Sequence, residues 1–309
     1  MAAEARFRSM GSDVHVIVVG GPPRLIDVAT GFIEDLESRW SRFRPTSEVS
    51  RLNARAGRPV TVSSETLVLV QRAVEGAHIT EGRFDPTLLG AVLRAGYDRS
   101  FDQLSGDSPR GRSSLSDGYE RILVDARSSS VTLPRGVGFD PGGIGKGLAA
   151  DLLVQKLQAQ GAAGACANVG GDLRVEGDGP QGESWIVAIE HPMGAKPAAT
   201  ISLRGGAVAT TSRMRRAWGP ESDRRHHLID PSTGQPAVSG LASATVVAAE
   251  AWHAEVVAKA AFLAGVSEGL FVLASTGTDG LLVDDHGTVY PSFGFDLFTG
   301  KDGAPSAAA

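Results

Sequence analysis

A glycine-rich segment at residues 140–147, Asp-Pro-Gly-Gly-Ile-Gly-Lys-Gly, has the composition of a turn that binds phosphate. The pattern that follows predicts a helix from about Lys146 to Gln160. Free N–H groups at a helix N-terminus bind phosphate oxygens, and Lys146 would add a positive charge. The segment is not a P-loop, because Asp140 and Gly147 stand where that motif requires glycine and serine or threonine. A tight turn without a ligand explains the glycines equally well.

A second glycine turn lies at residues 168–172, Asn-Val-Gly-Gly-Asp, directly after an apolar run. Gly170 and Gly171 would let a ligand approach the backbone, and Asn168 and Asp172 could bind ribose hydroxyls or the edge of a ring. The alternative is a β-turn closed by a hydrogen bond from the asparagine or aspartate side chain.

A pair of histidines opens the segment His226-His227-Leu228-Ile229-Asp230-Pro231. A histidine can take a proton from an attacking hydroxyl near pH 7, and Asp230 could orient it or stabilise the turn. Adjacent residues of a strand point to opposite faces, so at most one of the two histidines faces any cleft. A hydrogen-bonded structural histidine is the alternative.

Hydrophobic periodicity predicts the elements that must position these segments. Amphipathic helices with core-facing apolar stripes are expected at 24–43 and after Ser63 and Ser64, and further helices near 252–264 and 267–274. Because strands outnumber helices and come in consecutive pairs, we predict an α+β fold with mixed sheets flanked by helices, not a doubly wound parallel sheet. The expected strands are 14–19, 121–124, 130–133, 165–169, 185–190, 199–203, 207–211 and 242–248.

The length of 309 residues fits one large domain or two small ones, and we expect a single domain over residues 1–300. Residues 98–118, rich in Ser, Asp, Gly and Arg, are expected to form a mobile surface loop, and residues 301–309 a disordered tail. The single cysteine, Cys166, excludes a disulfide within the chain and is expected to be a buried thiol.

The charge pattern argues against nucleic acid as a partner, because the net charge is -5 and the basic residues are scattered. No stretch reaches the roughly 18 apolar residues of a membrane span, so stable membrane insertion is not expected. The first 20 residues have one short apolar run, Val14 to Val19, and no cleavage site, which predicts a cytoplasmic protein.

Six blocks occur together in one order, and with them the sequence resembles the FAD:protein FMN transferase (ApbE) family. The resemblance implies a T-fold-like α+β architecture of the ApbE type, with two lobes around a flavin cleft. The blocks are Met10-Gly11-Ser12, the segment 41–45 with 47–53, the segment 82–87, the two glycine turns at 140–147 and 168–172, and His227 to Pro231.

The resemblance implies transfer of FMN from FAD to a serine or threonine hydroxyl of an acceptor protein, with release of AMP and with Mg²⁺ as cofactor. His227 matches the family position that we interpret as the general base, with Asp230 beside it. The side chains and backbone implied to hold FAD are those of Met10, Phe43, Arg83, Phe84, Asp85, Asp140, Lys146, Asn168, Gly170, Gly171, Asp172 and Ile229.

The metal-binding block departs from the family. The family places an aspartate and, four residues later, a threonine on one helical face as metal ligands, with a backbone carbonyl that matches Gly143. Here Glu255 and Lys259 stand at these two positions. A divalent ion about 4 Å from a charged Lys259 would be repelled by roughly 8 kcal/mol at an effective dielectric of about 20.

Lys259 must therefore point away, lose its proton, or replace the metal and pair with Glu255 and the FAD diphosphate. We favour replacement as a hypothesis. An ordinary surface ion pair between Glu255 and Lys259, contributing about 0.3 to 0.5 kcal/mol, is the alternative without function.

Two other functions fit the same residues. The first is hydrolysis of FAD to FMN and AMP, with water in place of the acceptor hydroxyl. The second is a non-catalytic flavin-binding protein whose metal site has been lost. If the protein is cytoplasmic, its acceptor is cytoplasmic or receives FMN before export.

Overall fold

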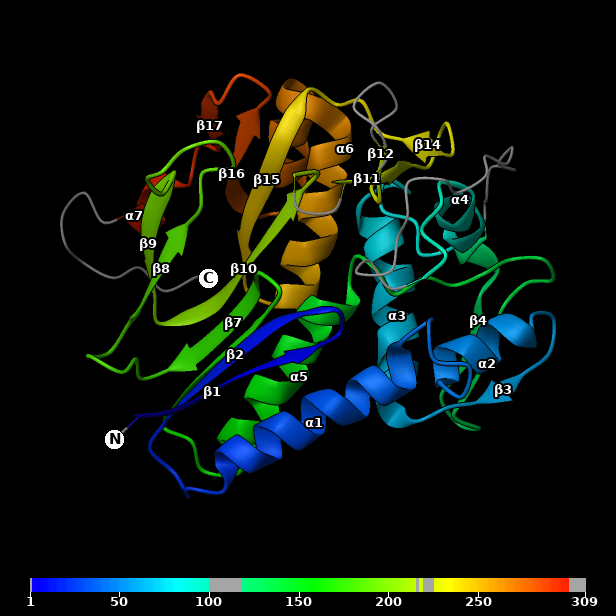
Figure 1. Ribbon diagram of the computed structural model, residues 1–309, viewed down its shortest axis with the longest axis horizontal. Helices are drawn as coiled ribbons and strands as arrows, with labels where there is room; N and C mark the ends of the chain where they lie inside the picture. The colour runs from blue at the N-terminus through cyan, green and yellow to red at the C-terminus, as the bar shows by residue number, and fades with distance from the viewer. Residues whose placement is uncertain (1, 100–117, 215–216, 219–224, 300–309) are drawn as a thin grey trace. The chain divides into compact units, whose positions relative to one another are not determined.

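The computed structural model describes residues 2–99, 118–214, 217–218 and 225–299 (Figure 1). The chain forms two compact units. Unit 1 comprises Met1–Asp35, Lys146–Ser212 and Ser239–Ala309, and unit 2 comprises Leu36–Gly145 and Arg213–Val238. The predicted loop at 98–118 and the predicted tail at 301–309 fall largely or wholly outside the described residues. The prediction of a single domain stays a prediction.

Unit 1 is built on an eight-stranded antiparallel sheet with the order β1-β2-β6-β7-β10-β15-β16-β17. A hairpin, β8 Trp185–Ile189 with β9 Ala199–Leu203, forms a second sheet. The strands of the large sheet are β1 Ala2–Ser9, β2 Ser12–Val19, β6 Gly164–Val169, β7 Asp172–Gly177, β10 Gly205–Ser212, β15 Leu241–Ala248, β16 Asp279–Asp284 and β17 Val289–Pro291. The helices of this unit are α5 Gly145–Ala159, α6 Ala251–Ser275, α7 Asp296–Thr299 and the first part of α1 Leu25–Trp40.

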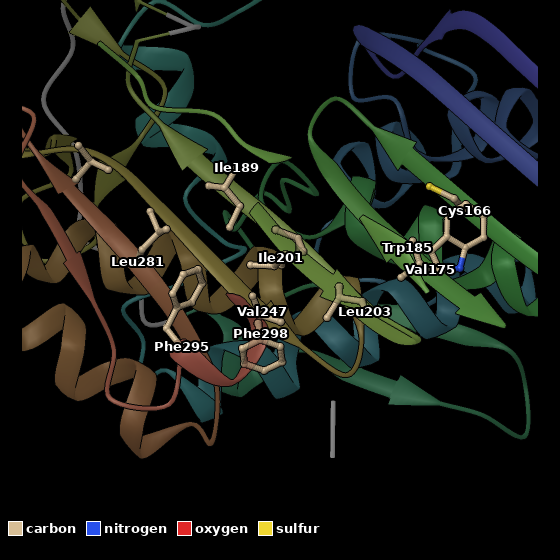
Figure 2. Packing of buried hydrophobic residues seen from close by; sticks show 12 residues of the cluster. Cys166, Val175, Trp185, Ile189, Ile201, Leu203, Val247, Leu281, Phe295 and Phe298 are labelled. Atoms are coloured by element: carbon tan, nitrogen blue, oxygen red, sulfur yellow. The ribbon is translucent and has the colours of Figure 1, made fainter. Parts of the chain in front are cut away.

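Both faces of the large sheet are covered at its central strands. Strand β15 is buried along its whole length, which requires a layer on each side. One layer is the hairpin with α7, whose apolar side chains pack against the sheet residues Val208, Val247 and Leu281 (Figure 2). The other is α6, which packs against β7, β10, β15 and β16. The predicted strands of this unit are confirmed to within one or two residues.

Element α6 consists of two helical stretches that meet at Gly265, which confirms the two helices predicted near 252–264 and 267–274. Gly265 has non-helical dihedral angles, and its φ of 80° is the left-handed conformation that glycine tolerates. By length and composition α6 as a whole is also apolar enough to cross a bilayer, which was not expected from the sequence. Of its most apolar window, 56% is buried inside the protein, as in a core helix.

Unit 2 combines short helices with three small sheets. Its three-stranded sheet has the order β3-β5-β4, and the pairs β11-β12 and β13-β14 form two ribbons. The helices are α2 Glu48–Ala54, α3 Ser64–Ile79, α4 Leu89–Arg94, the 3₁₀ turn Tyr119–Arg121 and the end of α1. The strands are β3 Val60–Thr61, β4 Leu123–Asp125, β5 Ser130–Thr132, β11 Ala217–Trp218, β12 Arg225–His226, β13 Ile229–Asp230 and β14 Gln235–Pro236. The two units together confirm the α+β prediction.

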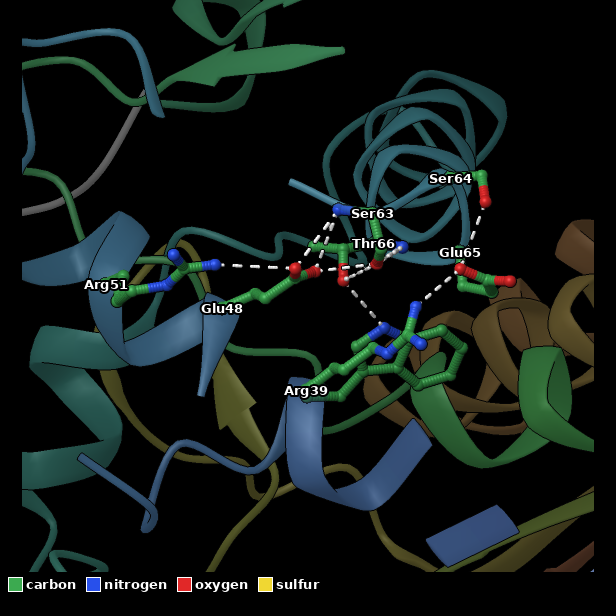
Figure 3. A network of polar contacts seen from close by, with 8 residues as sticks. Arg39, Glu48, Arg51, Ser63, Ser64, Glu65 and Thr66 are labelled. Atoms are coloured by element: carbon green, nitrogen blue, oxygen red, sulfur yellow. Dashed lines mark hydrogen bonds and ion pairs between the residues drawn. The ribbon is translucent and has the colours of Figure 1, made fainter. Parts of the chain in front are cut away.

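A polar network at the start of α3 ties three helices of unit 2 together (Figure 3). Ser63 caps α3 by accepting the Thr66 N–H, and its hydroxyl donates to Glu48 of α2 at 2.7 Å. Arg39, in the last turn of α1, donates to Glu65 at 2.8 Å. Burial alone would raise the pKa of Glu48, but hydrogen bonds from Thr66 and Ser63 hold it below its usual value.

Helix α1 ends at Trp40, three residues earlier than predicted. The indole N–H of Trp40 donates to Thr66, and the chain then turns, so that Arg44 N donates to the carbonyl of Ser41. Phe43 therefore belongs to the following turn, where 39% of its surface is exposed. Its expected place in the core stripe of a helix was wrong.

Candidate functional site

Some of the functional residues expected from the sequence gather in one group in each unit. In unit 1 a buried ion cluster joins Lys146 in the first turn of α5, Asp172 at the start of β7, and Glu255 in α6. The Lys146 ammonium donates to Asp172 Oδ2 and, at 2.9 Å, to Glu255 Oε1. The backbone N–H of Gly147 donates to the second carboxylate oxygen, Glu255 Oε2, at 2.8 Å. The sequence predicted these residues separately, and the structure brings them together.

The cluster has more negative than positive groups. The side chains of Asp172 and Glu255 are only 2% and 6% exposed, and that of Lys146 is 23% exposed. Burial on its own would lower the pKa of Lys146, but the two carboxylates raise it above its usual value, so the ammonium stays charged. Burial, and then the negative charge of Glu255, raise the pKa of Asp172. Because Glu255 is buried, it does not form the ordinary surface ion pair with Lys259 that was the alternative without function.

The close approach of α5 and α6 explains why glycine follows Lys146. A Cβ atom on Gly147 would lie 2.3 Å from the carbonyl oxygen of Ala251, so only glycine lets its N–H reach Glu255. Asp151 of α5 accepts the backbone N–H groups of Ala251 and Trp252, each at 2.8 Å, and so caps α6. The sequence patterns did not reveal Asp151. Burial raises its pKa to about 7, against the lowering effect of these two hydrogen bonds.

The second glycine turn, at residues 168–172, is closed by a side-chain hydrogen bond, as in the alternative that needs no ligand. Asn168 Oδ1 accepts the N–H of Gly171 at 2.9 Å, which is an Asx-type turn. Gly170 has a φ of 65°, and a Cβ there would lie 2.6 Å from Ser12 Oγ. Packing thus accounts for this glycine, and Asp172 is the residue of the turn that enters the ion cluster.

Met10 is placed by a tight hairpin. Ser9 pairs with Ser12, and the two residues between them, Met10 and Gly11, have φ values of 53° and 63°. Positive φ at both positions defines a type I′ turn, which joins β1 to β2. Met10 is half-buried at the tip of this hairpin.

In unit 2 an aromatic cluster surrounds the guanidinium of Arg42. This group lies 4.2 Å from the ring centroid of Phe43 and 4.6 Å from that of Tyr97. It also donates to the carbonyl of Tyr97 at 2.8 Å and lies 3.6 Å from Asp140 Oδ1. Arg42 and Tyr97 were not among the predicted site residues. The position of Arg42 beside Phe43 in the block 41–45 is the signal that could have found it.

The two histidines have different surroundings, although β12 ends at His226 and the predicted alternation along a strand does not apply to His227. His226 is 8% exposed, and its Nε2 lies 3.0 Å from the carbonyl oxygen of Ala237 while its Nδ1 accepts the N–H of Leu228 at 3.3 Å. Nε2 therefore carries the proton, and burial lowers the pKa of this imidazole. His227 is half-buried and meets the ring of Tyr97 edge-on, with centroids 6.5 Å apart. His226 is the structural histidine of the pair.

Other predicted side chains of unit 2 stabilise turns or the core. Asp230 Oδ1 accepts hydrogen bonds from the N–H of Ser232 at 2.8 Å and from the hydroxyl of Ser232 at 2.7 Å. Of the two roles considered for Asp230, these bonds correspond to stabilising the turn. Asp85 binds Thr87 in the same way, at 2.7 and 2.5 Å. Phe84 and Ile229 are 1% exposed, so their side chains are core, and a ligand would meet their backbone.

Three more predicted residues lie close to polar neighbours of unit 2. Asp140 Oδ1 accepts the N–H of Gly142 at 3.0 Å, in addition to its contact with Arg42. Arg83 lies 3.5 Å from Glu81 in a partly exposed pair. Gly143 donates its N–H to the carbonyl of Pro141 at 2.9 Å, which shapes the turn before α5.

A complete metal cage is absent from the part of the chain that the structure describes, where no three His, Cys, Asp or Glu side chains gather. The oxygens of Asp172 and Glu255 are nonetheless of the kind that Mg²⁺ prefers, and they converge on one cation, the ammonium of Lys146. Lys259 lies four residues after Glu255 on α6 and is half-buried. The described contacts do not test its predicted role.

Comparison with known proteins identifies the family. The family model for ApbE matches residues 10–282. The FAD:protein FMN transferase of Vibrio cholerae is 27% identical over 277 residues, 87% of this chain and 83% of the relative. That of Treponema pallidum is 30% identical over 271 residues, 81% of this chain and 74% of the relative.

Solved structures agree with this match. The crystal structure of the ApbE protein of Thermotoga maritima has a TM-score of 0.86 at 28% identity and covers 97% of this chain and 99% of its own. The apo form of the Pseudomonas stutzeri flavinyl transferase ApbE has a TM-score of 0.84 at 25% identity and covers 97% of each chain. With most of its length matched in sequence and in fold, the chain belongs to the ApbE family.

Proposed function

We propose that the chain is an FAD:protein FMN transferase, which moves FMN from FAD to a serine or threonine hydroxyl of an acceptor protein and releases AMP. The observation that carries this proposal is the family match over residues 10–282, whose relatives in Vibrio cholerae and Treponema pallidum bear this name. In the reaction the acceptor oxygen bonds to the phosphorus of the FMN half. The bond from that phosphorus to the bridging oxygen breaks, and AMP leaves with the bridging oxygen.

His227 is the proposed general base. The hydroxyl of the acceptor must lose a proton as it attacks, and an imidazole is suited to accept it near pH 7. Its neighbour His226 is excluded, because both of its ring nitrogens are engaged by Ala237 and Leu228. Asp230 supports His227 through the turn that it stabilises with Ser232.

Phe43 is the proposed stacking surface for the flavin ring. One side of the Phe43 ring carries the guanidinium of Arg42, while 39% of the residue remains exposed. An exposed aromatic face backed by a buried group provides a rigid platform for another ring. The side chain of Met10 and the backbone of the segment 83–85 are proposed as further flavin contacts.

The diphosphate of FAD requires a cation, because two carboxylates and one ammonium leave the Lys146 cluster with net negative charge. Mg²⁺ bound by Glu255 would offset the charge that develops as the anhydride breaks. Glu255 already accepts from an ammonium and a backbone N–H, which supports the alternative that no metal is needed. We propose that Lys259 supplies the missing positive charge.

The test incubates the purified protein with FAD and a candidate acceptor domain, in Mg²⁺ or in EDTA, and measures the mass of the acceptor and the AMP released. An FMN mass increment in EDTA supports Lys259 as the cation, whereas an increment only with Mg²⁺ removes the Lys259 proposal and keeps the transferase. AMP without an increment on any acceptor indicates hydrolysis. Tight FAD binding without either product indicates a flavin-binding protein.

A pair of histidine variants tests the base. Removing a general base lowers the rate by about 10²- to 10⁴-fold, which we expect for His227→Asn. His286→Asn, at an exposed histidine of unit 1, is the matched control and should transfer FMN at the normal rate. A His227→Asn protein with normal turnover would disprove the assignment. A cytoplasmic location stays a prediction, to be checked by fractionation of cells.

A further inference from the structure

The ring of Tyr97 contacts aromatic side chains from three other segments of unit 2. Its centroid lies 5.9 Å from that of Phe43, 5.7 Å from that of Trp218 and 6.5 Å from that of His227. The planes of Tyr97 and His227 meet at 72°, the edge-to-face arrangement that aromatic pairs prefer. One buried ring thus contacts both the proposed flavin platform and the proposed base.

The position of Tyr97 is determined by the end of α4. Gly96 adopts a φ of 97°, and the N–H of Tyr97 donates to the carbonyl of Val92 at 3.1 Å. This six-to-one bond after a left-handed glycine is the Schellman motif, which ends a helix in a defined direction. The apolar contact that accompanies the motif is present, since Tyr97 and Val92 belong to one core cluster. The ring is therefore held by backbone geometry.

Arg42 connects this ring to the rest of the site. Its guanidinium lies over the rings of Tyr97 and Phe43, donates to the carbonyl of Tyr97, and lies 3.6 Å from Asp140. A guanidinium stacked on an aromatic face loses little entropy when it also forms hydrogen bonds. Loss of the Tyr97 ring would free both Arg42 and Phe43 on that side.

We propose that Tyr97 is a positioning residue, which sets the spacing and the relative orientation of Phe43 and His227. The inference rests on the proposed function, in which Phe43 stacks on the flavin and His227 accepts the proton. Tyr97 contacts neither reacting atom in this account, and acts by holding the two residues that do. Its aromatic ring is the feature that matters, so phenylalanine should replace it.

The test compares Tyr97→Leu with Tyr97→Phe in FMN transfer, with kcat and the KM for FAD measured separately. Loss of the contacts to His227 and Phe43 should lower kcat by roughly tenfold or more, because both residues would then leave the reactive arrangement for part of the time. We expect a smaller, few-fold rise in KM, and we expect Tyr97→Phe to restore kcat to within about twofold. Tyr290→Leu, at a half-buried tyrosine of unit 1, is the matched control for loss of a ring.

Nuclear magnetic resonance of histidine-labelled protein supplies a readout that does not depend on turnover. The Tyr97 ring shifts the His227 resonances by its ring current, and this shift should disappear in Tyr97→Leu and persist in Tyr97→Phe. Through-space contacts between the Tyr97 and His227 rings are expected in the wild type, which keeps the inference testable if Tyr97→Leu does not fold.

A Tyr97→Leu protein with wild-type kcat and KM would overturn the proposal, and so would wild-type spectra without contact between the two rings. Failure of the proposed function is distinguishable, because the wild type would then transfer FMN to no acceptor while the ring contacts were still observed. A tenfold loss in Tyr97→Phe as well would show that the hydroxyl, not the ring, is what the site requires, and would also overturn it.

Discussion

Replacement of Lys146 by methionine should destabilise the protein strongly, because it leaves Asp172 and Glu255 buried without their counter-ion. At 2.9 Å from Glu255 Oε1, the ammonium contributes about 6 kcal/mol of attraction at an effective dielectric of about 20. The contact with Asp172 adds to this, while the desolvation of the ammonium, which methionine avoids, opposes it. Breaking a buried pair by removal of one partner costs about 3 to 5 kcal/mol, and we expect a loss in that range.

Urea denaturation at pH 7 of four proteins measures this effect: wild type, Lys146→Met, Glu255→Gln and the double variant. Removal of Glu255 from the Lys146→Met protein takes away one uncompensated carboxylate, so the double variant should be less destabilised than the sum of the single variants. The coupling free energy should exceed about 1 kcal/mol, beyond the additivity error of roughly 0.5 kcal/mol. A methionine variant within about 1 kcal/mol of the wild type, or additive effects, would refute the reasoning.

Three further predictions concern other sites. Burial lowers the pKa of His226 below its ordinary value of 6.5. The neutral imidazole therefore stabilises the fold above pH 6.5, and this stabilisation is lost as the pH falls below 6.5. Thermal melts of His226→Gln at several pH values should lack this loss of stability. Burial raises the pKa of Cys166 to about 12, so a thiol reagent at pH 8 should react with it only after unfolding, and rapid labelling of native protein would contradict this. Gly147→Ala should lower the free energy of unfolding by about 2 kcal/mol or more, because the new Cβ would lie 2.3 Å from the Ala251 carbonyl oxygen. Urea denaturation measures this loss, and an alanine variant as stable as the wild type would show that α5 and α6 can separate.

Periodicity predicted the interior strands β2, β6, β10 and β15 and the long helices, because each has a buried face that the pattern records. It missed the interior strands β7 and β16, and it missed the edge strand β1, where charged residues alternate with uncharged ones and most of the strand is exposed. It also extended α1 to Phe43, since Phe43 lies three residues after Trp40 and fits the helical stripe. The spacing cannot reveal that the chain turns there.

The six blocks singled out Lys146 and Asp172 but could not predict which side chains meet in the fold. Lys146 meets Asp172 and Glu255, which lie 26 and 109 residues away, and no local pattern records such a pairing. Asp151 escaped notice for the same reason, because its partners begin 100 residues later at Ala251. Tyr97 acquires its importance only when Phe43, Trp218 and His227 gather around it.

The interleaving of the two units has a consequence for synthesis of the protein on the ribosome. Strand β2 pairs with β6, which begins at Gly164, and the large sheet is complete only when β17 has emerged. The first hairpin must therefore wait for about 145 residues to be translated, which at 5–20 residues per second takes roughly 7 to 30 seconds. During this interval β2 is paired with β1 but lacks β6 on its other edge, and a chaperone that binds nascent chains would find its apolar residues exposed. Truncated chains that end before β6 should be the ones most prone to aggregate.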